Sequence, residues 1–470
     1  MTDLLKKAPM RELVRALRER QTSARSLAEE AIANHGRFDG ALHAYKTWLP
    51  DRVLAEADAA DAAFAAGFEL GVLQGLPVSV KDLYGVPGYP TFAGSPRELP
   101  EKWRTPGPVV ERLRAGLAVI TGKTHTVEFA FGGVGLNPHW GTPVNPWSGD
   151  SHRAPGGSSA GAGVSLIEGT AAFALGSDTA GSVRAPASIT GTVGVKTTYG
   201  RWSLDGIVPL SPSLDTAGIL ARTAEDAAIA FAAIDPMVAL PPLDFADLAA
   251  RCEPADFSLA ICDWLFEDCG PGIADLVKNA VNELAAAGVA VSTIDFPEMA
   301  SADELFRAGG LAAPEFAAFI SGELSDWRET LDANVASRFA RMEAVTAVDY
   351  LHRVRDIAGL ARRAHALLED HDLVVGPTVA ITPPEVESLT APAAYRTANL
   401  AILRNTAPVN LMGLCAVTIP VALDGEGMPV GLQIIAAGGE DERAIAAACA
   451  FEHVLGTARE RLGVAPRCPD

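Results

Sequence analysis

The chain has 470 residues, of which 49% are hydrophobic and 20% charged, a composition typical of a globular protein with a large core. Its formal net charge of −20 disfavours nucleic acid and anionic membranes as partners, because both are polyanions. We expect neither a transmembrane helix nor a secretory signal, since no run of about 18 apolar residues occurs and the N-terminus lacks an apolar core.

The six cysteines are few for this length and show no Cys-x-x-Cys spacing. Such usage is typical of reduced thiols and favours a cytoplasmic protein without a disulfide framework. Cys262 and Cys269 could form part of a metal site, but no histidine lies near them in the sequence. We therefore predict no metal site.

The N-terminal segment, residues 1–68, carries helical patterns. Leu13, Val14 and Leu17 repeat at helical spacing, and the alanine-rich stretch Leu54–Ala66 predicts a third helix. Such an arm could contact a partner, including a second copy in a homodimer. Packing against its own domain is the favoured interpretation.

Apolar stretches then alternate with helical ones. Helices are predicted over residues 108–115 and 273–287, between strands at residues 76–80, 117–121, 170–175, 257–262 and 289–294. This alternation predicts an α/β fold with a mixed, largely parallel central sheet flanked by helices.

Two further strands, Val417–Leu423 and Val430–Ala436, flank the turn Asp424–Gly427 and predict an antiparallel hairpin near one sheet edge. A helix over residues 440–455 closes the chain. No repeat or linker is evident, so we expect one large α/β/α domain over residues 1–470. Its expected parts are N-terminal helices (1–68), a core (70–220), a variable helical and substrate region (235–400) and the C-terminal part of the core (400–470).

Two serine-bearing glycine loops, Pro155–Gly163 and Gly176–Pro186, stand out in the core. Glycine loses the most conformational freedom on folding, so such clusters indicate sharp bends or close approaches. The first loop fits Gly-x-Ser-x-Gly with Ser159 at its centre, but no hydrophobic strand precedes it, as a nucleophile elbow requires. The Gly-Lys-Ser/Thr of a phosphate-binding loop is also absent.

A nucleophilic serine needs a base to remove its proton. Three of the eight lysines, Lys81, Lys123 and Lys196, adjoin apolar strands, where burial would favour the neutral amine. A histidine is the alternative base. The histidines near the glycine loops are His125, His139 and His152.

These segments resemble the signature of the amidase signature family of serine hydrolases. Residues 156–161, Gly-Gly-Ser-Ser-Ala-Gly, resemble its first serine loop, and residues 176–186 resemble its second block. Val80-Lys81-Asp82 is similar to the segment that carries its lysine. Ala160 and Ala180 each stand where the family has a glycine, a change that narrows the loops without abolishing the pattern.

The resemblance implies a nucleophile at Ser182, a bridging serine at Ser158 and a base at Lys81. It implies an oxyanion hole made by the backbone N–H groups of Thr179, Ala180, Gly181 and Ser182. It also implies that Phe131, Gly132 and Gly133 bind substrate, in an apolar stretch that favours a pocket without strong charge unless residues 295–400 add polar groups. Asp178, Arg184 and Lys196 are expected to be structural.

The predicted function is hydrolysis of a small-molecule carboxylic amide to an acid and an amine or ammonia, through an acyl-enzyme on Ser182 and without any cofactor. An alternative is the amidase (glutaminase) subunit of a glutamyl-tRNA amidotransferase complex. A third is a non-enzymatic scaffold, which the intact set of Lys81, Ser158 and Ser182 disfavours. The sequence does not identify the amide.

Overall fold

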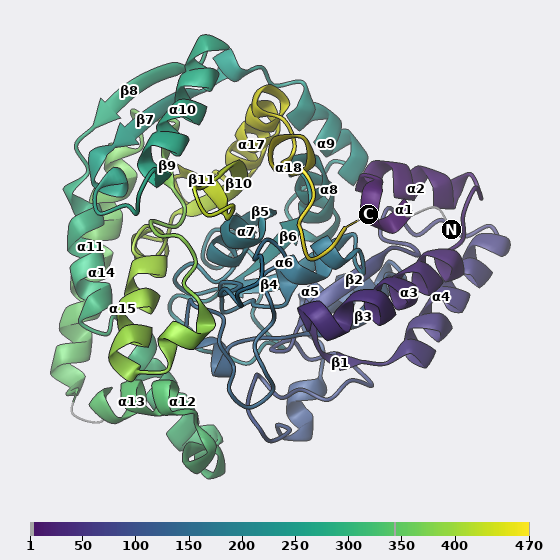
Figure 1. The fold of residues 1–470 in the computed structure, drawn as a ribbon, viewed down its shortest axis with the longest axis horizontal. Helices are drawn as coiled ribbons and strands as arrows, with labels where there is room; N and C mark the ends of the chain where they lie inside the picture. The colour runs from purple at the N-terminus through teal and green to yellow at the C-terminus, as the bar shows by residue number, and fades with distance from the viewer. Residues whose placement is uncertain (1–3, 343–344, 470) are drawn as a thin grey trace.

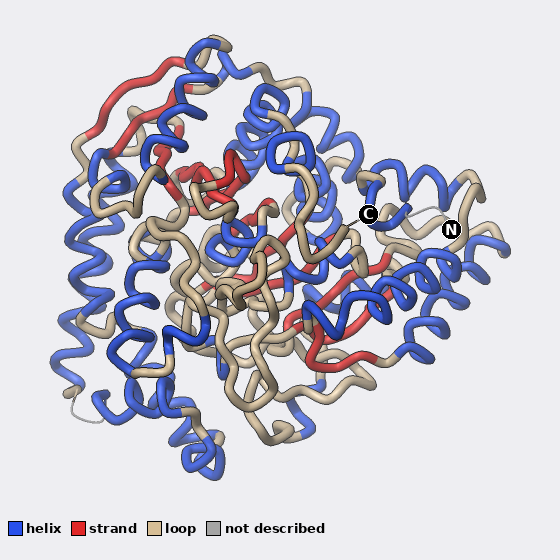
Figure 2. Tube along the Cα trace, in the orientation of Figure 1, coloured by secondary structure: helices blue, strands red, loops and turns tan. Residues whose placement is uncertain are grey.

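The computed structural model describes residues 4–342 and 345–469. Eleven strands form one sheet in the order β1-β3-β2-β4-β6-β5-β10-β11-β9-β7-β8. Figure 2 draws these strands in red. The strands are β1 (Tyr45–Trp48), β2 (Pro77–Lys81), β3 (Val119–Thr124), β4 (Phe173–Asp178), β5 (Val193–Lys196), β6 (Thr216–Ala221), β7 (Ser258–Cys262), β8 (Ala290–Ile294), β9 (Leu373–Pro377), β10 (Cys415–Leu423) and β11 (Pro429–Ala436).

The helices cover this sheet and extend from both of its ends (Figure 1). They are α1 (Leu4–Lys7), α2 (Met10–Arg18), α3 (Ala24–Leu42), α4 (Pro50–Ala65), α5 (Pro108–Ala115), α6 (Ala162–Glu168), α7 (Arg184–Thr190), α8 (Ala224–Ile234), α9 (Pro242–Ala250), α10 (Ile273–Ala286), α11 (Pro297–Arg307), α12 (Ala312–Glu323), α13 (Ala333–Met342), α14 (Ala347–Leu367), α15 (Pro392–Leu403), α16 (Ala407–Leu411), α17 (Asp441–Leu455) and α18 (Ala458–Leu462). Every residue of β2, β4 and β6 is buried, as expected for strands covered on both faces.

The prediction of a mixed α/β sheet flanked by helices is confirmed, but parallel pairing is less common than we expected. Among the described residues, four neighbouring pairs are parallel (β2 with β3 and β4, β7 with β8 and β9) and six are antiparallel. Two of the parallel pairs, β2 with β3 and β7 with β8, are each joined by a predicted strand–helix–strand unit. The antiparallel centre is built from β5, β6 and β9, which the sequence patterns did not reveal.

The predicted hairpin of β10 and β11 is confirmed, with Val417 opposite Ile434. Its predicted place near a sheet edge is wrong. β10 pairs on its other side with β5, and β11 pairs with β9, so the hairpin lies inside the sheet. Both of its outer edges therefore have their backbone hydrogen bonds satisfied by strands that are distant in sequence.

The N-terminal helices pack against their own domain. The backbone N–H of Met10, which begins α2, donates to the Asp226 carboxylate of α8 at 2.6 Å, and Arg11 forms a 2.7 Å ion pair with Asp247 of α9. The two ends of the chain also meet, because Lys6 Nζ donates to the carbonyl of Pro469 at 2.7 Å (Figure 1). No helix in the described part of the chain has the length and apolar character needed to span a membrane.

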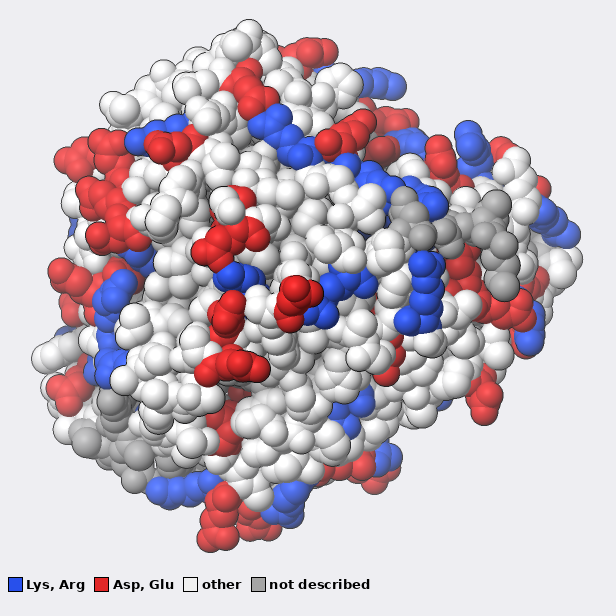
Figure 3. Space-filling model, viewed as in Figure 1, with Lys and Arg blue, Asp and Glu red and all other residues white. Residues whose placement is uncertain are grey.

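Charged side chains of both signs are interspersed over the face shown in Figure 3, although acidic residues outnumber basic ones in the whole chain. Such mixing gives short ion pairs across the surface.

The sheet brings the two glycine loops together. β2 and β4 are parallel neighbours, with Val80 opposite Leu175, so both carboxyl ends lie at the same edge. β2 ends at Lys81, and β4 ends at Asp178, where the second glycine loop begins. The first loop leads into α6, which packs beside these strands.

Candidate active site

Lys81 lies at the carboxyl end of β2 and is completely buried. Its Nζ donates to Ser158 Oγ at 2.7 Å and to Ser177 Oγ at 2.9 Å. Both serines are buried, Ser158 in the first glycine loop and Ser177 near the end of β4. The ammonium group therefore has only neutral hydroxyl and carbonyl oxygens as direct hydrogen-bond partners in the described structure.

This environment lowers the pKa of Lys81 from 10.5 to about 7. Burial is the main cause, because a low dielectric disfavours the charged amine. The negative charges of Asp178 and Asp215 oppose the shift but do not cancel it. A substantial fraction of the amine is thus neutral near pH 7, and its lone pair can accept a proton from Ser158.

Ser182 lies in the second glycine loop, just before α7, and lines a cavity of the described structure. The Ser159 N–H donates to the Ser182 carbonyl at 3.2 Å, which ties the two loops together. The peptide bond between Gly157 and Ser158 is cis. Ser159 itself is buried, and its hydroxyl faces the Ser177 carbonyl at 3.4 Å instead of lining the cavity.

A buried ion pair fixes the turn that carries Ser182. Arg184 donates to both carboxylate oxygens of Asp178, at 3.0 and 3.1 Å, and both residues are fully buried. Burial disfavours the charge of Asp178, but the Arg184 guanidinium more than compensates and holds the pKa of that carboxyl well below its usual range. Asp178 also accepts from the N–H groups of Gly181 and Val183, so it shapes the turn as a structural residue.

Gly181 and Ala180, two of the four residues expected to form the oxyanion hole, differ in their backbone conformation. Gly181 has φ +131°, and a Cβ there would lie 2.1 Å from Thr406 Oγ1, so only glycine is accommodated. Its N–H already donates to Asp178 Oδ1 at 2.7 Å. Ala180 is not among the residues with a positive φ, so its backbone conformation accommodates alanine where the family has glycine. Its carbonyl accepts a hydrogen bond from Thr406 Oγ1 at 2.7 Å.

Asp215 is a buried group of this site that sequence reasoning missed. Its Oδ1 accepts from the Thr179 hydroxyl at 2.5 Å, and its Oδ2 accepts from the N–H groups of Leu210 and Ser211 at 2.9 Å. Burial raises its pKa to about 6 despite these donors. The available signal was an aspartate placed directly before the apolar stretch that forms β6.

The cavity beside Ser182 has a volume of about 430 Å³. Phe131 and Gly132 line it, as do Thr179 and Ala180. Gly133, which was expected beside them, lies outside the lining, because its N–H donates to Asn399 and Leu403 occupies the space where a Cβ would point. The stretch around Phe131 adds no charge to the wall, and residues 295–400 contribute the polar groups that the sequence left open, since α11, α13 and α15 each add an arginine.

The two other candidate lysines are buried but do not touch either glycine-loop serine. Lys123 Nζ pairs with Asp82 at 3.0 Å. Lys196 Nζ donates to the carbonyls of Thr197 and Leu414, and burial lowers its pKa to about 8. Both contacts are those of structural lysines.

None of the three candidate histidines is hydrogen-bonded through its ring to a glycine-loop serine in the described structure. The His125 ring packs against His43 with centroids 4.4 Å apart, and burial holds its pKa well below 6.5. His152 Nε2 lies 3.2 Å from the Pro143 carbonyl, and His139 Nε2 lies 3.1 Å from Glu128 Oε1. The lysine is thus the candidate base in contact with a loop serine.

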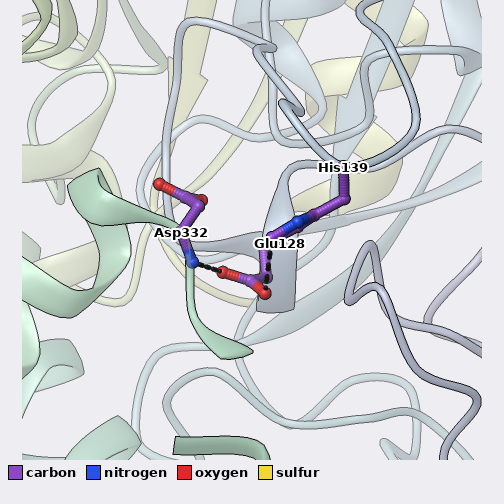
Figure 4. A group of neighbouring side chains, drawn as sticks. All are labelled: Glu128, His139 and Asp332. Carbon is purple, nitrogen blue, oxygen red and sulfur yellow. Dashed lines mark hydrogen bonds and ion pairs between the residues drawn. The ribbon is translucent and has the colours of Figure 1, made fainter. Parts of the chain in front are cut away.

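Glu128, His139 and Asp332 lie close enough together to share a metal ion (Figure 4). The side chains of all three residues already have hydrogen-bond partners, however. Glu128 Oε2 accepts from the Asp332 backbone N–H at 2.7 Å, and Asp332 Oδ1 accepts from the N–H groups of Asn334 and Val335. This group is a hydrogen-bonded clamp between the segment Glu128–Ala130 and the start of α13.

Comparison with known proteins places this geometry in a family. The family model described as Amidase matches residues 26–445. A 2-amino-5-chloromuconic acid deaminase from Comamonas testosteroni is 47% identical, with 96% of this chain and 97% of that protein covered. A glutamyl-tRNA(Gln) amidotransferase subunit from Thermobifida fusca is 32% identical, with 97% of each covered.

A solved structure described as an amidase superimposes with a TM-score of 0.85 at 28% identity, covering 95% of this chain and all of the other. Sequence and fold therefore agree over nearly the whole length. The chain belongs to the amidase signature family and is an amide-cleaving hydrolase that acts on small molecules.

Proposed function

We propose that the enzyme hydrolyses its amide through an acyl-enzyme on Ser182, with Lys81 as the base and Ser158 as the bridge between them. The observation that carries this proposal is the buried 2.7 Å contact between Lys81 Nζ and Ser158 Oγ, next to a cavity lined by Ser182. A lysine is a usable base only when it is neutral, and burial lowers the pKa of Lys81 to about 7.

In this mechanism, neutral Lys81 accepts the Ser158 proton while Ser158 accepts the Ser182 proton, and Ser182 Oγ attacks the amide carbonyl. The same path returns a proton to the leaving nitrogen, because an amide anion is a very poor leaving group. Water then attacks the acyl-enzyme and releases the acid. The proton moves along one chain of groups in both half-reactions.

The developing oxyanion requires N–H donors at the second glycine loop. We assign this role to Thr179, Ala180 and Ser182, since the Gly181 N–H is engaged by Asp178. Asp215 holds the Thr179 side chain and so positions the first of these donors. Phe131 and Gly132 would contact the acyl part of the substrate, while Gly133 would support them from behind.

The physiological reaction has a second candidate, which the 47% identity to a 2-amino-5-chloromuconic acid deaminase favours: release of ammonia from an amino-substituted unsaturated acid. The glutaminase subunit of a tRNA amidotransferase receives less support, because that relative is only 32% identical. A scaffold is disfavoured by the buried contact of Lys81 with Ser158.

The purified chain, without any partner, should release ammonia from members of a panel of aliphatic, aryl and ureido amides and amino-substituted unsaturated acids. Ser182→Ala should remove this activity and keep the thermal transition. Activity that appears only after a partner protein is co-expressed would instead support the amidotransferase alternative.

We further propose a cytoplasmic protein without nucleic acid or membrane partners, on the basis of the free thiols of all six cysteines and the net charge of −20. A homodimer stays a hypothesis, since the N-terminal helices already pack on their own domain. Light scattering of the purified protein measures its mass directly and decides between one copy and two.

A further inference from the structure

We propose that the substrate carries a carboxylate in addition to the scissile bond, and that Arg338 of α13 binds it. This inference rests on the proposed function for the position of the scissile bond at Ser182. Every charged side chain lining the described cavity is an arginine: Arg307, Arg338 and Arg396. A cavity whose charge is entirely positive matches an anionic ligand.

The remaining residues that line the cavity indicate the chemical character of the substrate between its scissile bond and its carboxylate. It is mostly apolar, and includes Leu210, Leu214, Phe306 and Leu403. Such a wall would contact a hydrocarbon body. A short acid with an amide at its other end combines these three features.

The three arginines differ in how free they are to bind a ligand. Arg307 forms an ion pair with Asp303 at 2.5 Å, so its charge is already compensated. Arg396, in the first half of α15, is exposed and forms no hydrogen bond or ion pair with the described residues. Arg338 is half-buried and has no acidic partner among the described residues.

Arg338 is also held in place. Its Nη1 donates to the Phe131 carbonyl at 2.7 Å, and its guanidinium lies over the rings of Phe131 and Tyr395, 4.8 and 5.5 Å from their centroids. A guanidinium has five N–H donors in a planar fork, so donors remain after this contact. A carboxylate can accept two of them side by side.

The helix that carries Arg338 is anchored to the same wall. The Glu128–Asp332 hydrogen bond fixes the start of α13 to the segment that leads into Phe131. The segment leading into Phe131 and the helix that carries Arg338 are therefore fixed to each other. This keeps the Arg338 guanidinium in position before a ligand binds. Preorganisation of this kind reduces the entropy lost on binding.

The protein as a whole repels anions, since its net charge is −20. A local positive cavity is what an acidic enzyme needs to attract an anionic substrate. The competing explanation is that Arg338 only tethers α13 to Phe131. If that were its role, replacing Arg338 would weaken the binding of carboxylate-bearing and neutral amides equally. If Arg338 binds the carboxylate, the replacement weakens only the carboxylate-bearing ones, and the test measures this difference.

The test compares amides that differ only in the carboxylate: succinamic, glutaramic and adipamic acids against butyramide, pentanamide and hexanamide. Binding is measured by calorimetry in the Ser182→Ala background, which prevents turnover, and kcat/KM is measured with Ser182 intact. Arg338→Gln removes the charge and the fork, and Arg338→Lys keeps only the charge. Arg112→Gln, on the exposed face of α5, removes the same charge far from the cavity.

At least one acid should bind about 10-fold to 100-fold more tightly than its neutral partner, with a matching preference in kcat/KM expressed mainly in KM. Arg338→Gln should abolish the preference, Arg338→Lys should reduce it, and Arg112→Gln should keep it. Equal binding of acids and neutral amides, or a preference that survives Arg338→Gln, would overturn the inference. Binding with this preference but no hydrolysis of any amide would instead refute the proposed function alone.

Discussion

Lys81 shows how one residue's environment decides its chemistry. Lys81, Lys123 and Lys196 all lie next to buried strands, and all three are buried. Lys123 keeps a carboxylate partner, and Lys196 donates to two carbonyls. Of the three, only Lys81 combines a pKa lowered to about 7 with a hydrogen bond to a serine of the glycine loops.

We expect kcat/KM to rise with pH through a limb centred near pH 7, because the neutral amine is the active form. Lys81→Met keeps the length of the side chain without a base, and should lower kcat about 10²–10⁴-fold and remove this limb. Lys81→Arg should be similarly inactive, because a guanidinium stays protonated. A pH–rate profile that keeps its limb in Lys81→Met would show that another group is the base.

Stability provides an independent check on the same residue. The folded-state pKa of Lys81 is about 7 and its ordinary value is 10.5, so the unfolded chain binds more protons between these values. The Lys81 contribution to the unfolding free energy therefore rises as pH increases from 7 to 10.5. Denaturant titrations across this window should show a steeper rise for the wild type than for Lys81→Met.

Among single residues, the sequence identified the candidate catalytic residues that lie within a recognisable sequence motif. The lysine and the two serines were assigned from the resemblance, and the structure places Lys81 against Ser158. Ser177 and Asp215 were not predicted, since a hydroxyl within a strand forms no motif and the position of Asp215 directly before β6 is only a weak signal. Arg338 was also missed, because helical periodicity in residues 295–370 does not tell which residues face a distant cavity.

At the scale of elements, the clamp between the segment Glu128–Ala130 and α13 connects two stretches that are about 200 residues apart. Burial raises the pKa of Glu128 to about 8, and the nearby Asp332 charge adds to the shift. Glu128 is thus largely protonated near neutral pH. Its deprotonation would place a second negative charge beside Asp332 in a buried site.

We expect Glu128→Gln to become progressively more stable than the wild type as pH rises from 5 to 8. The folded carboxyl has a pKa raised from 4.5 to about 8, so the folded state binds more protons in this window, and the wild type loses stability as pH rises. The difference in unfolding free energy should reach on the order of 1–3 kcal/mol. Exposed Glu111→Gln is the control, and a constant difference for Glu128→Gln would contradict a titrating clamp.

Local patterns predicted the elements well where a capping or turn signal was present. The helix α5 occupies its predicted span, Pro108–Ala115, with proline at its first position. The short strand β1 was missed, since four residues between two helices show too little alternation. The pairing of β5 with β10 could not be predicted either, because about 220 residues separate them and no local signal encodes such contacts.

At the scale of the whole molecule, strands from distant parts of the chain interleave in one sheet. β10 and β11, from the C-terminal part, lie between β5 of the core and β9 of the helical region. The core, the helical region and the C-terminal part each contribute strands to this one sheet, so none of them forms it alone. We therefore propose that residues 1–470 unfold as one unit.

Calorimetry should accordingly show one thermal transition whose calorimetric and van't Hoff enthalpies agree. Far-UV and near-UV circular dichroism should report the same midpoint. Two resolved transitions would show that the sheet contains separable folding units. This experiment does not depend on any catalytic assignment.

The central claim is that Ser182 is the nucleophile, and covalent labelling tests it most directly. A fluorophosphonate probe should modify Ser182, with slower modification in Lys81→Met and none in Ser182→Ala. Ser159 and Ser182 fall in one tryptic peptide, residues 154–184, so fragment spectra must locate the adduct. An adduct on Ser182 is the predicted result, and an adduct on Ser159, or full amidase activity in Ser182→Ala, would contradict the account.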